Sequence, residues 1–235
     1  MERGALSDEA FPKFAEKYVV FMHITTRIEG EKYDKLLSEK GGTGFPYLAY
    51  LDADGNVIAK HEGQRTVDGF ETTAGKAREF LELKKKAEGG DKAARIDLLK
   101  KQIEFRHFDS LEAKKRVEAM ADLDEATKKD LLEKIVALKI YEILGTITAD
   151  KATRAAAGKK YNEMRLAGEI PNGERELQYF WMFILEYAES IKDVKLYEDG
   201  VKAVEAAFGA KANYKRWIDQ IKQKLETLKA NDREH

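Results

Sequence analysis

The residue types that most often carry chemistry are sparse in this chain. It contains no cysteine and only four histidines, which are His23, His61, His107 and His235. Without a thiol, the chain cannot itself perform thiol–disulfide exchange or hold a metal through thiolates. No two histidines have the spacing of helical metal ligands. We therefore expect no metal site and no cofactor, and we interpret His23, in an apolar stretch, as a core histidine rather than a general base.

Serine and acidic residues do not form a catalytic constellation either. A G-x-S-x-G nucleophile motif is missing, and the serines after Ser7 fall in or beside predicted helices. Asp52, Asp54 and Asn56 alternate as calcium ligands do, but Gly63 stands where the bidentate acid of such a loop is needed. The glycines of residues 41–44 lack the lysine of a P-loop and precede a predicted strand. The sequence thus predicts that this chain, as it stands, is not an enzyme.

Composition narrows the range of partners. The chain has 235 residues, of which 43% are hydrophobic and 36% charged, with 42 basic and 43 acidic side chains and a formal net charge of −1. This balance favours neither nucleic acid nor an anionic membrane as a partner. The longest apolar run, around residues 179–185, is far shorter than the ~20 residues of a membrane span. The first residues show no secretory signal, so the cytoplasm is the expected location.

The first third of the chain mixes helices and strands. Helical spacing covers residues 7–17, 31–39 and 67–87, whereas β-branched and aromatic residues predict strands over 18–26, 47–51 and 56–61. The strand over 18–26 is nearly continuous in apolarity, which is typical of a strand covered on both faces. Asp54-Gly55 between the last two strands predicts a hairpin turn. Gly89-Gly90 closes the segment, so we expect a first domain over residues 1–88.

Everything after Asp91 is predicted to be helical, and residues 91–235 should form a second, larger domain. The expected helices span residues 92–108, 110–121, 124–144, 148–167, 174–190, 194–208 and 212–229. Short connections favour antiparallel helical hairpins, although no strict tetratricopeptide period is present. The aromatic helix around Trp181 and Tyr187 is interpreted mainly as core, with a hydrophobic pocket lined by these two residues as the functional alternative. The predicted fold class is a small α/β module followed by an all-α domain.

The order of elements over residues 7–87 resembles the thioredoxin superfamily downstream of its active-site motif. Residues 44–48 (GFPYL) look like the family's loop in which a cis-proline opens a strand, and residues 51–58 look like its hairpin. Glu62-Gly63 followed by Phe70 resembles the end of the last strand and the closing helix. The likeness covers about a third of the chain.

This resemblance implies a cis peptide bond before Pro46. It also implies that Phe45, Pro46 and Tyr47 border a groove where an extended peptide docks. The family normally supplies a preceding strand and a Cys-x-x-Cys motif, and residues 1–6 are too few to hold them. Only the peptide-binding half of the family's site is therefore expected here, in an incomplete thioredoxin-like module.

Three accounts of the missing strand stay open. The chain is a fragment whose start lies upstream, or the predicted strands over 18–26 and 47–51 pair directly, or another subunit supplies a strand. An exposed strand edge invites pairing with other chains, so a homo-oligomer through the open edge is a further expectation.

The functional prediction is a redox-inactive, thioredoxin-like adaptor or chaperone-like binder of extended polypeptide. A first alternative is the remainder of a thiol–disulfide oxidoreductase whose Cys-x-x-Cys lies upstream of Met1. A second alternative is an enzyme that resembles glutathione transferases, which join a thioredoxin-like domain to a helical one. The expected partner is a protein or extended peptide, without nucleic acid or membrane.

Overall fold

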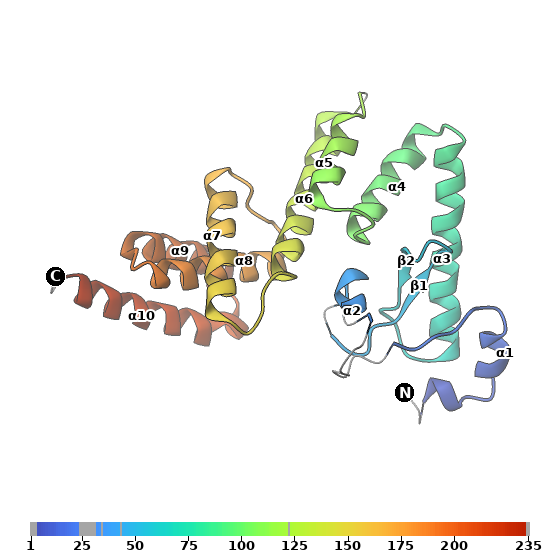
Figure 1. The fold of residues 1–235 in the computed structure, drawn as a ribbon, viewed down its shortest axis with the longest axis horizontal. Helices are drawn as coiled ribbons and strands as arrows, with labels where there is room; N and C mark the ends of the chain where they lie inside the picture. The colour runs from blue at the N-terminus through green and yellow to red at the C-terminus, as the bar shows by residue number, and fades with distance from the viewer. Residues whose placement is uncertain (1–3, 24–31, 34, 43, 122, 234–235) are drawn as a thin grey trace. The chain divides into compact units, whose positions relative to one another are not determined.

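The structure is a computed structural model that describes residues 4–23, 32–33, 35–42, 44–121 and 123–233. The chain divides into two compact units, residues 1–108 and residues 109–235, and it is mostly helical. A small α/β part and a helical part are thus present (Figure 1). The first unit extends beyond the boundary expected at residues 89–90, because helix α4 (Lys92–Glu104) packs against α3 (Val67–Glu88).

The first unit is built on the predicted hairpin. Strands β1 (Ala49–Leu51) and β2 (Val57–Lys60) pair antiparallel, with a register irregularity between Tyr50 and Leu51. Gly55 adopts φ +78° in the turn, a conformation that glycine accepts without a steric penalty. The Asp52 carboxylate accepts hydrogen bonds from the backbone N–H groups of Asp54 and Asn56 at 3.0 and 2.8 Å. The hairpin prediction is therefore confirmed.

The long helix α3 packs against this hairpin, and three short helices precede the hairpin in the chain. The short ones are η1 (Ala5–Ser7), α1 (Phe11–Ala15) and α2 (Leu36–Glu39), so the helix predicted over 7–17 is shorter than expected. Thr66 caps α3 by accepting a hydrogen bond from the Gly69 N–H at 3.1 Å. Buried Ile58, Ala59, Ala77 and Phe80 join β2 to α3 in one apolar cluster.

The strand predicted over residues 18–26 is wrong for the part that the structure describes. Residues 19–23 have neither helix nor strand, and residues 24–26 lie outside the described residues. Val19 is 95% exposed and Met22 is 80% exposed, so this segment is not covered on both faces as expected. The helix predicted over 31–39 is seen only as α2, with residues 31 and 34 outside the described ones.

The second unit consists of helices joined by short connections. Its helices are α5 (Ser110–Glu118), α6 (Glu125–Leu144), α7 (Lys151–Leu166), α8 (Glu174–Ser190), α9 (Val194–Phe208) and α10 (Lys215–Arg233), with the turn η2 (Ala212–Tyr214) before α10. Consecutive helices contact each other, most extensively α7 with α8. Aspartates at N-caps accept hydrogen bonds from first-turn N–H groups in α5, α6, α7 and α9. The prediction of packed helical hairpins is confirmed.

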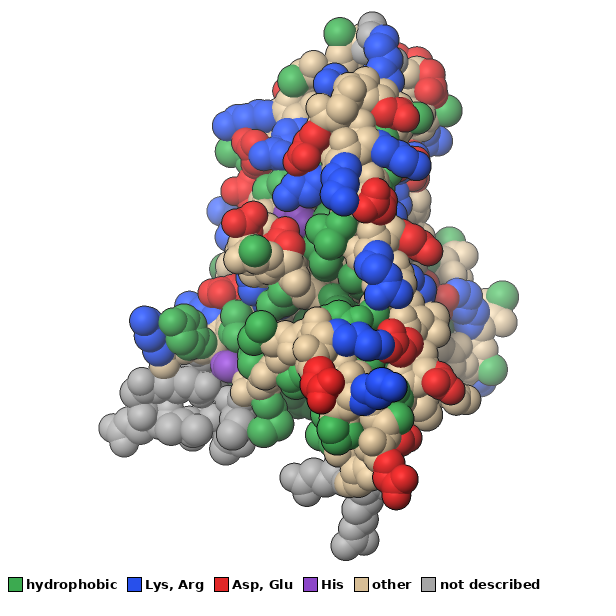
Figure 2. Space-filling model, turned by 90° about the vertical axis from the view of Figure 1, so that its right-hand side faces the viewer, with side chains coloured by type: hydrophobic (Ala, Val, Ile, Leu, Met, Phe, Trp, Pro, Cys, Tyr) green, Lys and Arg blue, Asp and Glu red, His purple; other side chains and the backbone are tan. Residues whose placement is uncertain are grey.

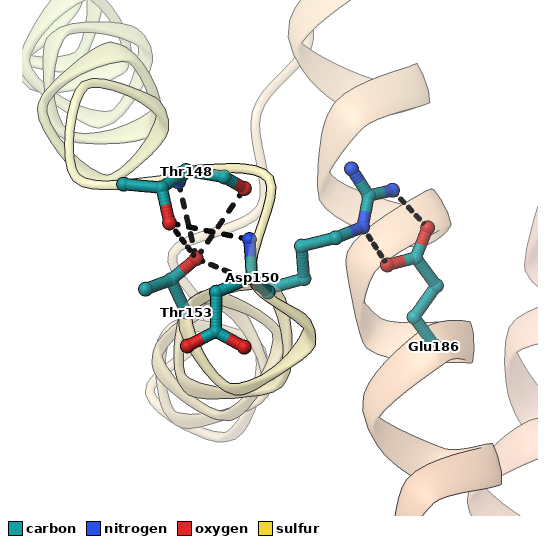
Figure 3. A network of polar contacts seen from close by, with 5 residues as sticks. Thr148, Asp150, Thr153 and Glu186 are labelled. Atoms are coloured by element: carbon teal, nitrogen blue, oxygen red, sulfur yellow. Dashed lines mark hydrogen bonds and ion pairs between the residues drawn. The ribbon is translucent and has the colours of Figure 1, made fainter.

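A polar network fixes the start of α7 and its attachment to α8 (Figure 3). The Thr153 hydroxyl donates to the Asp150 carbonyl at 2.8 Å, and the Thr148 N–H donates to the Thr153 hydroxyl at 3.1 Å. Arg154 forms a two-point ion pair with Glu186 of α8, with Nε 2.8 Å from Oε2. These contacts explain the close packing of the two helices and do not form an open polar site.

Candidate functional site

The outer edge of strand β1 is the feature of the first unit that points most directly to binding. The His61 N–H donates to the Leu48 carbonyl at 2.9 Å, which makes Leu48 and His61 a hydrogen-bonded pair. Hydrogen-bonded and non-hydrogen-bonded pairs alternate along an antiparallel ladder. Tyr50 and Ala59 therefore form the next hydrogen-bonded pair, and the backbone N–H and C=O of Ala49 point away from β2.

The same reasoning applies beyond the register irregularity. The Asp52 N–H donates to the Asn56 carbonyl at 2.9 Å, and Leu51 pairs with Val57 in the next position. The backbone groups of Leu51 thus also point away from β2. Within the described part of the chain, no hydrogen bond reaches the outward groups of Ala49 or Leu51. The outer edge of strand β1 therefore has backbone groups that no described residue pairs with.

One outward carbonyl on the opposite edge of the hairpin has a partner. The His107 Nε2 atom donates a 2.6 Å hydrogen bond to the carbonyl of Val57, on the outer side of β2. The His107 ring packs 5.7 Å from the Phe80 ring, and burial lowers the pKa of His107. Among the described residues, an outward carbonyl of β2 is therefore already bonded, whereas no outward group of β1 is.

An exposed apolar segment begins close to this edge. The Tyr18 ring lies 5.3 Å from the Tyr50 ring of β1 in an edge-on arrangement. The next residues along the chain are exposed to solvent, with Val20 58% and Phe21 64% exposed in addition to Val19 and Met22. No backbone hydrogen bond joins residues 19–22 to another described residue. The segment combines apolar side chains with unpaired backbone, as an unsatisfied strand does.

An aromatic cluster holds the start of this segment in place. Phe14 is 7% exposed and lies 5.9 Å from the Phe70 ring and 5.0 Å from the Tyr18 ring. The Tyr50 hydroxyl donates to the Phe70 carbonyl at 3.0 Å. Hydrophobic side chains gather over the lower part of the face in Figure 2, where α1 and the start of α3 lie. The apolar segment is thus attached to a packed part of the first unit.

The residues of the resemblance-based groove are partly accessible. The Phe45–Pro46 peptide bond is cis, as predicted, and Phe45 is 69% exposed. Tyr47 is half-buried, its hydroxyl donates to the Lys40 carbonyl at 2.6 Å, and burial raises its pKa to about 12. Phe45 and Pro46 therefore lie on the surface, four and three residues before β1, whereas Tyr47 has a structural hydrogen bond.

Trp181 and Tyr187 lie in the packing of the second unit. Trp181 is 7% exposed and contacts the Phe180 ring edge-on at 5.4 Å. A Cβ atom added at Gly158 of α7 would lie 2.6 Å from the Tyr187 Cβ, so the two helices approach closely there. The surface hollow of about 430 Å³ between α6 and α7 is lined by other residues, including Lys139 and Glu142. These positions support the core interpretation of the aromatic helix.

One polar group that the sequence analysis did not single out is the His61 imidazole. Its Nδ1 atom lies 2.8 Å from the Thr73 hydroxyl, which donates its own proton to the Gly69 carbonyl at 3.0 Å. Nδ1 must therefore carry the ring proton, and Nε2 is a buried acceptor that no described residue meets. No group of three metal-binding side chains forms among the residues that the structure describes. A lone imidazole of this kind has no sequence signal, because its partner Thr73 lies twelve residues away, in helix α3.

Comparisons with known proteins give no family for this chain. No family model, no curated protein and no solved structure matches it. The thioredoxin-like resemblance therefore stays a prediction. In the described part of the chain, no helix has the length and apolarity that crossing a bilayer requires.

Proposed function

We propose that the protein binds an extended polypeptide segment along the outer edge of β1, as a redox-inactive adaptor or chaperone-like binder. The observation that carries this proposal is that two features occur near strand β1, where the Tyr18 ring contacts the Tyr50 ring. The outward backbone groups of Ala49 and Leu51 lack partners among the described residues, and the exposed apolar residues 19–22 begin beside the same strand.

Strand addition explains how such an edge recognises a ligand. The main-chain groups of β1 supply hydrogen bonds that do not depend on the ligand's sequence, and neighbouring side chains select what is bound. Each hydrogen bond contributes a net ~0.5–1.5 kcal/mol. Two outward residues alone give weak binding, so the apolar contacts of Phe21 and its neighbours must supply much of the affinity.

The chemistry of this surface defines the ligand class. The exposed residues Val19, Val20, Phe21 and Met22 are uncharged, and methionine adapts to ligands of different shape. An apolar segment in extended conformation, from an unfolded or partly folded protein, fits this surface better than a charged helix does. Thiol chemistry is not part of the proposal, because the chain contains no cysteine.

The experiment uses a labelled, reduced and carboxymethylated α-lactalbumin as a permanently unfolded probe. Fluorescence anisotropy should show binding to the intact chain that weakens at least several-fold in the double variant Val19→Ser/Phe21→Ser. Ala49→Pro should weaken it as well, because proline removes an outward N–H group while leaving the β1–β2 hydrogen bonds in place.

The matched control is the double variant Leu111→Ser/Leu166→Ser. Both leucines are exposed, at 63% and 71%, but they belong to helices of the second unit. This control should bind the probe as the unaltered chain does. Equal loss in both double variants, or no loss in either, would contradict binding at β1.

A further inference from the structure

Asn172 lies on the connection between α7 and α8 and is followed by a glycine. The carboxamide carbon of an asparagine can be attacked by the backbone nitrogen of the next residue, which closes a succinimide ring. A glycine in that next position has no Cβ atom to hinder the attack. The other asparagines precede residues with larger side chains; they are Asn56, Asn162, Asn213 and Asn231. The Asn-Gly step of this chain is therefore at residues 172–173.

The backbone nitrogen at this step is not held by a hydrogen bond. Asn172 is exposed, and among the described residues no group accepts a hydrogen bond from the Gly173 N–H. Gly173 is the N-cap of α8, and its carbonyl accepts the hydrogen bond of the Leu177 N–H at 2.8 Å. The positive end of the α8 dipole stabilises the negative charge that the nitrogen acquires when it loses its proton. The Gly173 nitrogen is therefore well placed to act as the nucleophile.

Aspartate followed by glycine can close the same ring, but the glycine nitrogens of the three Asp-Gly steps are occupied. The Gly55 N–H donates to the Asp52 carbonyl at 3.0 Å, and the Gly69 N–H donates to the Thr66 hydroxyl at 3.1 Å. Gly200 lies inside helix α9, where a backbone N–H bonds to the carbonyl of the preceding turn. The Asn-Gly step thus differs from the Asp-Gly steps in the hydrogen bonding of its nitrogen.

The Asn172 side chain joins the α7–α8 connection to helix α6. Its Nδ2 donates a hydrogen bond to the Glu133 Oε2 at 2.8 Å. An aspartate in place of Asn172 has no proton to donate when it is ionised, and its charge then faces the Glu133 carboxylate. Conversion of the amide to an acid therefore replaces an attractive contact with a repulsive one, and it loosens the attachment of the connection to α6.

We propose that Asn172 is a site of spontaneous deamidation and that this modification releases the α7–α8 connection from Glu133. The Gly173 nitrogen forms a bond to the Asn172 Cγ, the Cγ–Nδ2 bond breaks, and the proton of the Gly173 N–H leaves with the amide nitrogen as ammonia. Water then opens the succinimide at either carbonyl and gives aspartate or isoaspartate. Water is the only co-reactant. The site lies in the second unit, so it does not depend on polypeptide binding at β1.

The experiment incubates the intact, folded chain in mildly alkaline buffer at physiological temperature. Trypsin releases the site in the peptide of residues 166–175, and mass spectrometry follows the change from amide to acid. A sample digested without incubation gives the background. Conversion at Asn172 should be at least several-fold faster than at Asn162 and Asn213, and an isoaspartyl methyltransferase should label the incubated chain but not the Asn172→Gln control. Conversion no faster than at Asn162 and Asn213, or equal labelling of the control, would overturn the proposal.

A second measurement tests the consequence of the modification. Asn172→Asp is introduced into the unaltered chain and into Glu133→Ala, whose side chain is partly exposed at residue 133. Asn172→Asp should lower the urea midpoint in the unaltered chain more than it does in Glu133→Ala, because the lost hydrogen bond and the new repulsion both require Glu133. Any gain from an acidic residue near the α8 N-terminus is common to both backgrounds. Equal changes of the midpoint in the two backgrounds would overturn the proposed release from Glu133.

Discussion

His107 and Val57 are joined by a hydrogen bond of 2.6 Å from the imidazole Nε2 to the backbone carbonyl. The carbonyl can only accept, so Nε2 carries the proton and Nδ1 is unprotonated in the neutral ring. This contact attaches the turn after α4 to the outer edge of β2. It also makes the stability of the first unit sensitive to the protonation of one histidine.

The first prediction concerns pH. Burial lowers the pKa of His107 below its ordinary value of 6.5, so the unfolded chain binds a proton more readily than the folded one. Neutral His107 makes its whole contribution to the free energy of unfolding at pH values above its pKa in the unfolded chain. This contribution is lost as the pH falls below about 6.5 toward the lower pKa of His107 in the folded chain. Urea denaturation at about pH 7.5 and 5.5 should show a smaller difference between the unaltered chain and His107→Gln at the lower pH. A difference that does not change with pH would contradict this role.

The second prediction concerns the His61–Thr73 contact. Thr73→Val removes the acceptor of the His61 Nδ1–H while keeping the shape of the side chain, and it should cost about 1–3 kcal/mol of unfolding free energy. Thr73→Ser keeps the hydroxyl and is the matched control, with a smaller loss from the missing methyl group. Chemical denaturation measures both. Equal losses in the two variants would show that the hydrogen bond contributes nothing.

The third prediction concerns the close approach of α7 and α8. A Cβ atom at Gly158 would lie 2.1 Å from the Phe183 carbonyl oxygen, and this backbone atom cannot move aside alone. Gly158→Ala should therefore lower the free energy of unfolding by about 1–3 kcal/mol, because the helices must separate. Gly75→Ala in α3 is the control: the nearest atom to its added Cβ is the Arg78 Nη2, at 3.9 Å, so helix propensity should stabilise it by up to ~1 kcal/mol. Thermal denaturation that shows the same sign for both variants would contradict the close-approach argument.

Local signals explain which parts of the fold the sequence predicts. Helices α8 and α9 begin and end at the predicted residues, because Asp193 caps α9 and the apolar spacing is regular. The Asp54-Gly55 turn is found because glycine at positive φ is a local requirement. A strand over 18–26 needs a neighbouring strand to accept its hydrogen bonds, and β propensity alone does not provide one.

Some side chains of the first unit come together only through contacts between distant segments. Lys60 and Arg106 are 46 positions apart in the sequence and meet only because α4 packs on α3 and its last turn reaches β2. The same packing places α4 in the first unit, which the Gly89-Gly90 boundary did not indicate. The groove predicted at Phe45 and Pro46 rests on resemblance alone, since no local rule assigns these residues a role, and it stays a prediction.

The last prediction links the hairpin turn to the proposed binding edge. Gly55 at φ +78° closes the turn between β1 and β2, and a β-branched side chain is strongly disfavoured in this conformation. Gly55→Val should lower the free energy of unfolding of the first unit by about 1–3 kcal/mol, whereas Gly55→Asn should cost less because asparagine tolerates left-handed backbone.

The same pair of variants separates stability from binding. If β1 carries the polypeptide site, Gly55→Asn should retain affinity for carboxymethylated α-lactalbumin, because its hairpin keeps the register that turns Ala49 outward. Gly55→Val should bind carboxymethylated α-lactalbumin more weakly. Its remaining binding should disappear at a lower urea concentration than the binding of Gly55→Asn does. Full affinity in Gly55→Val, together with a lowered unfolding midpoint, would show that the probe binds away from the hairpin.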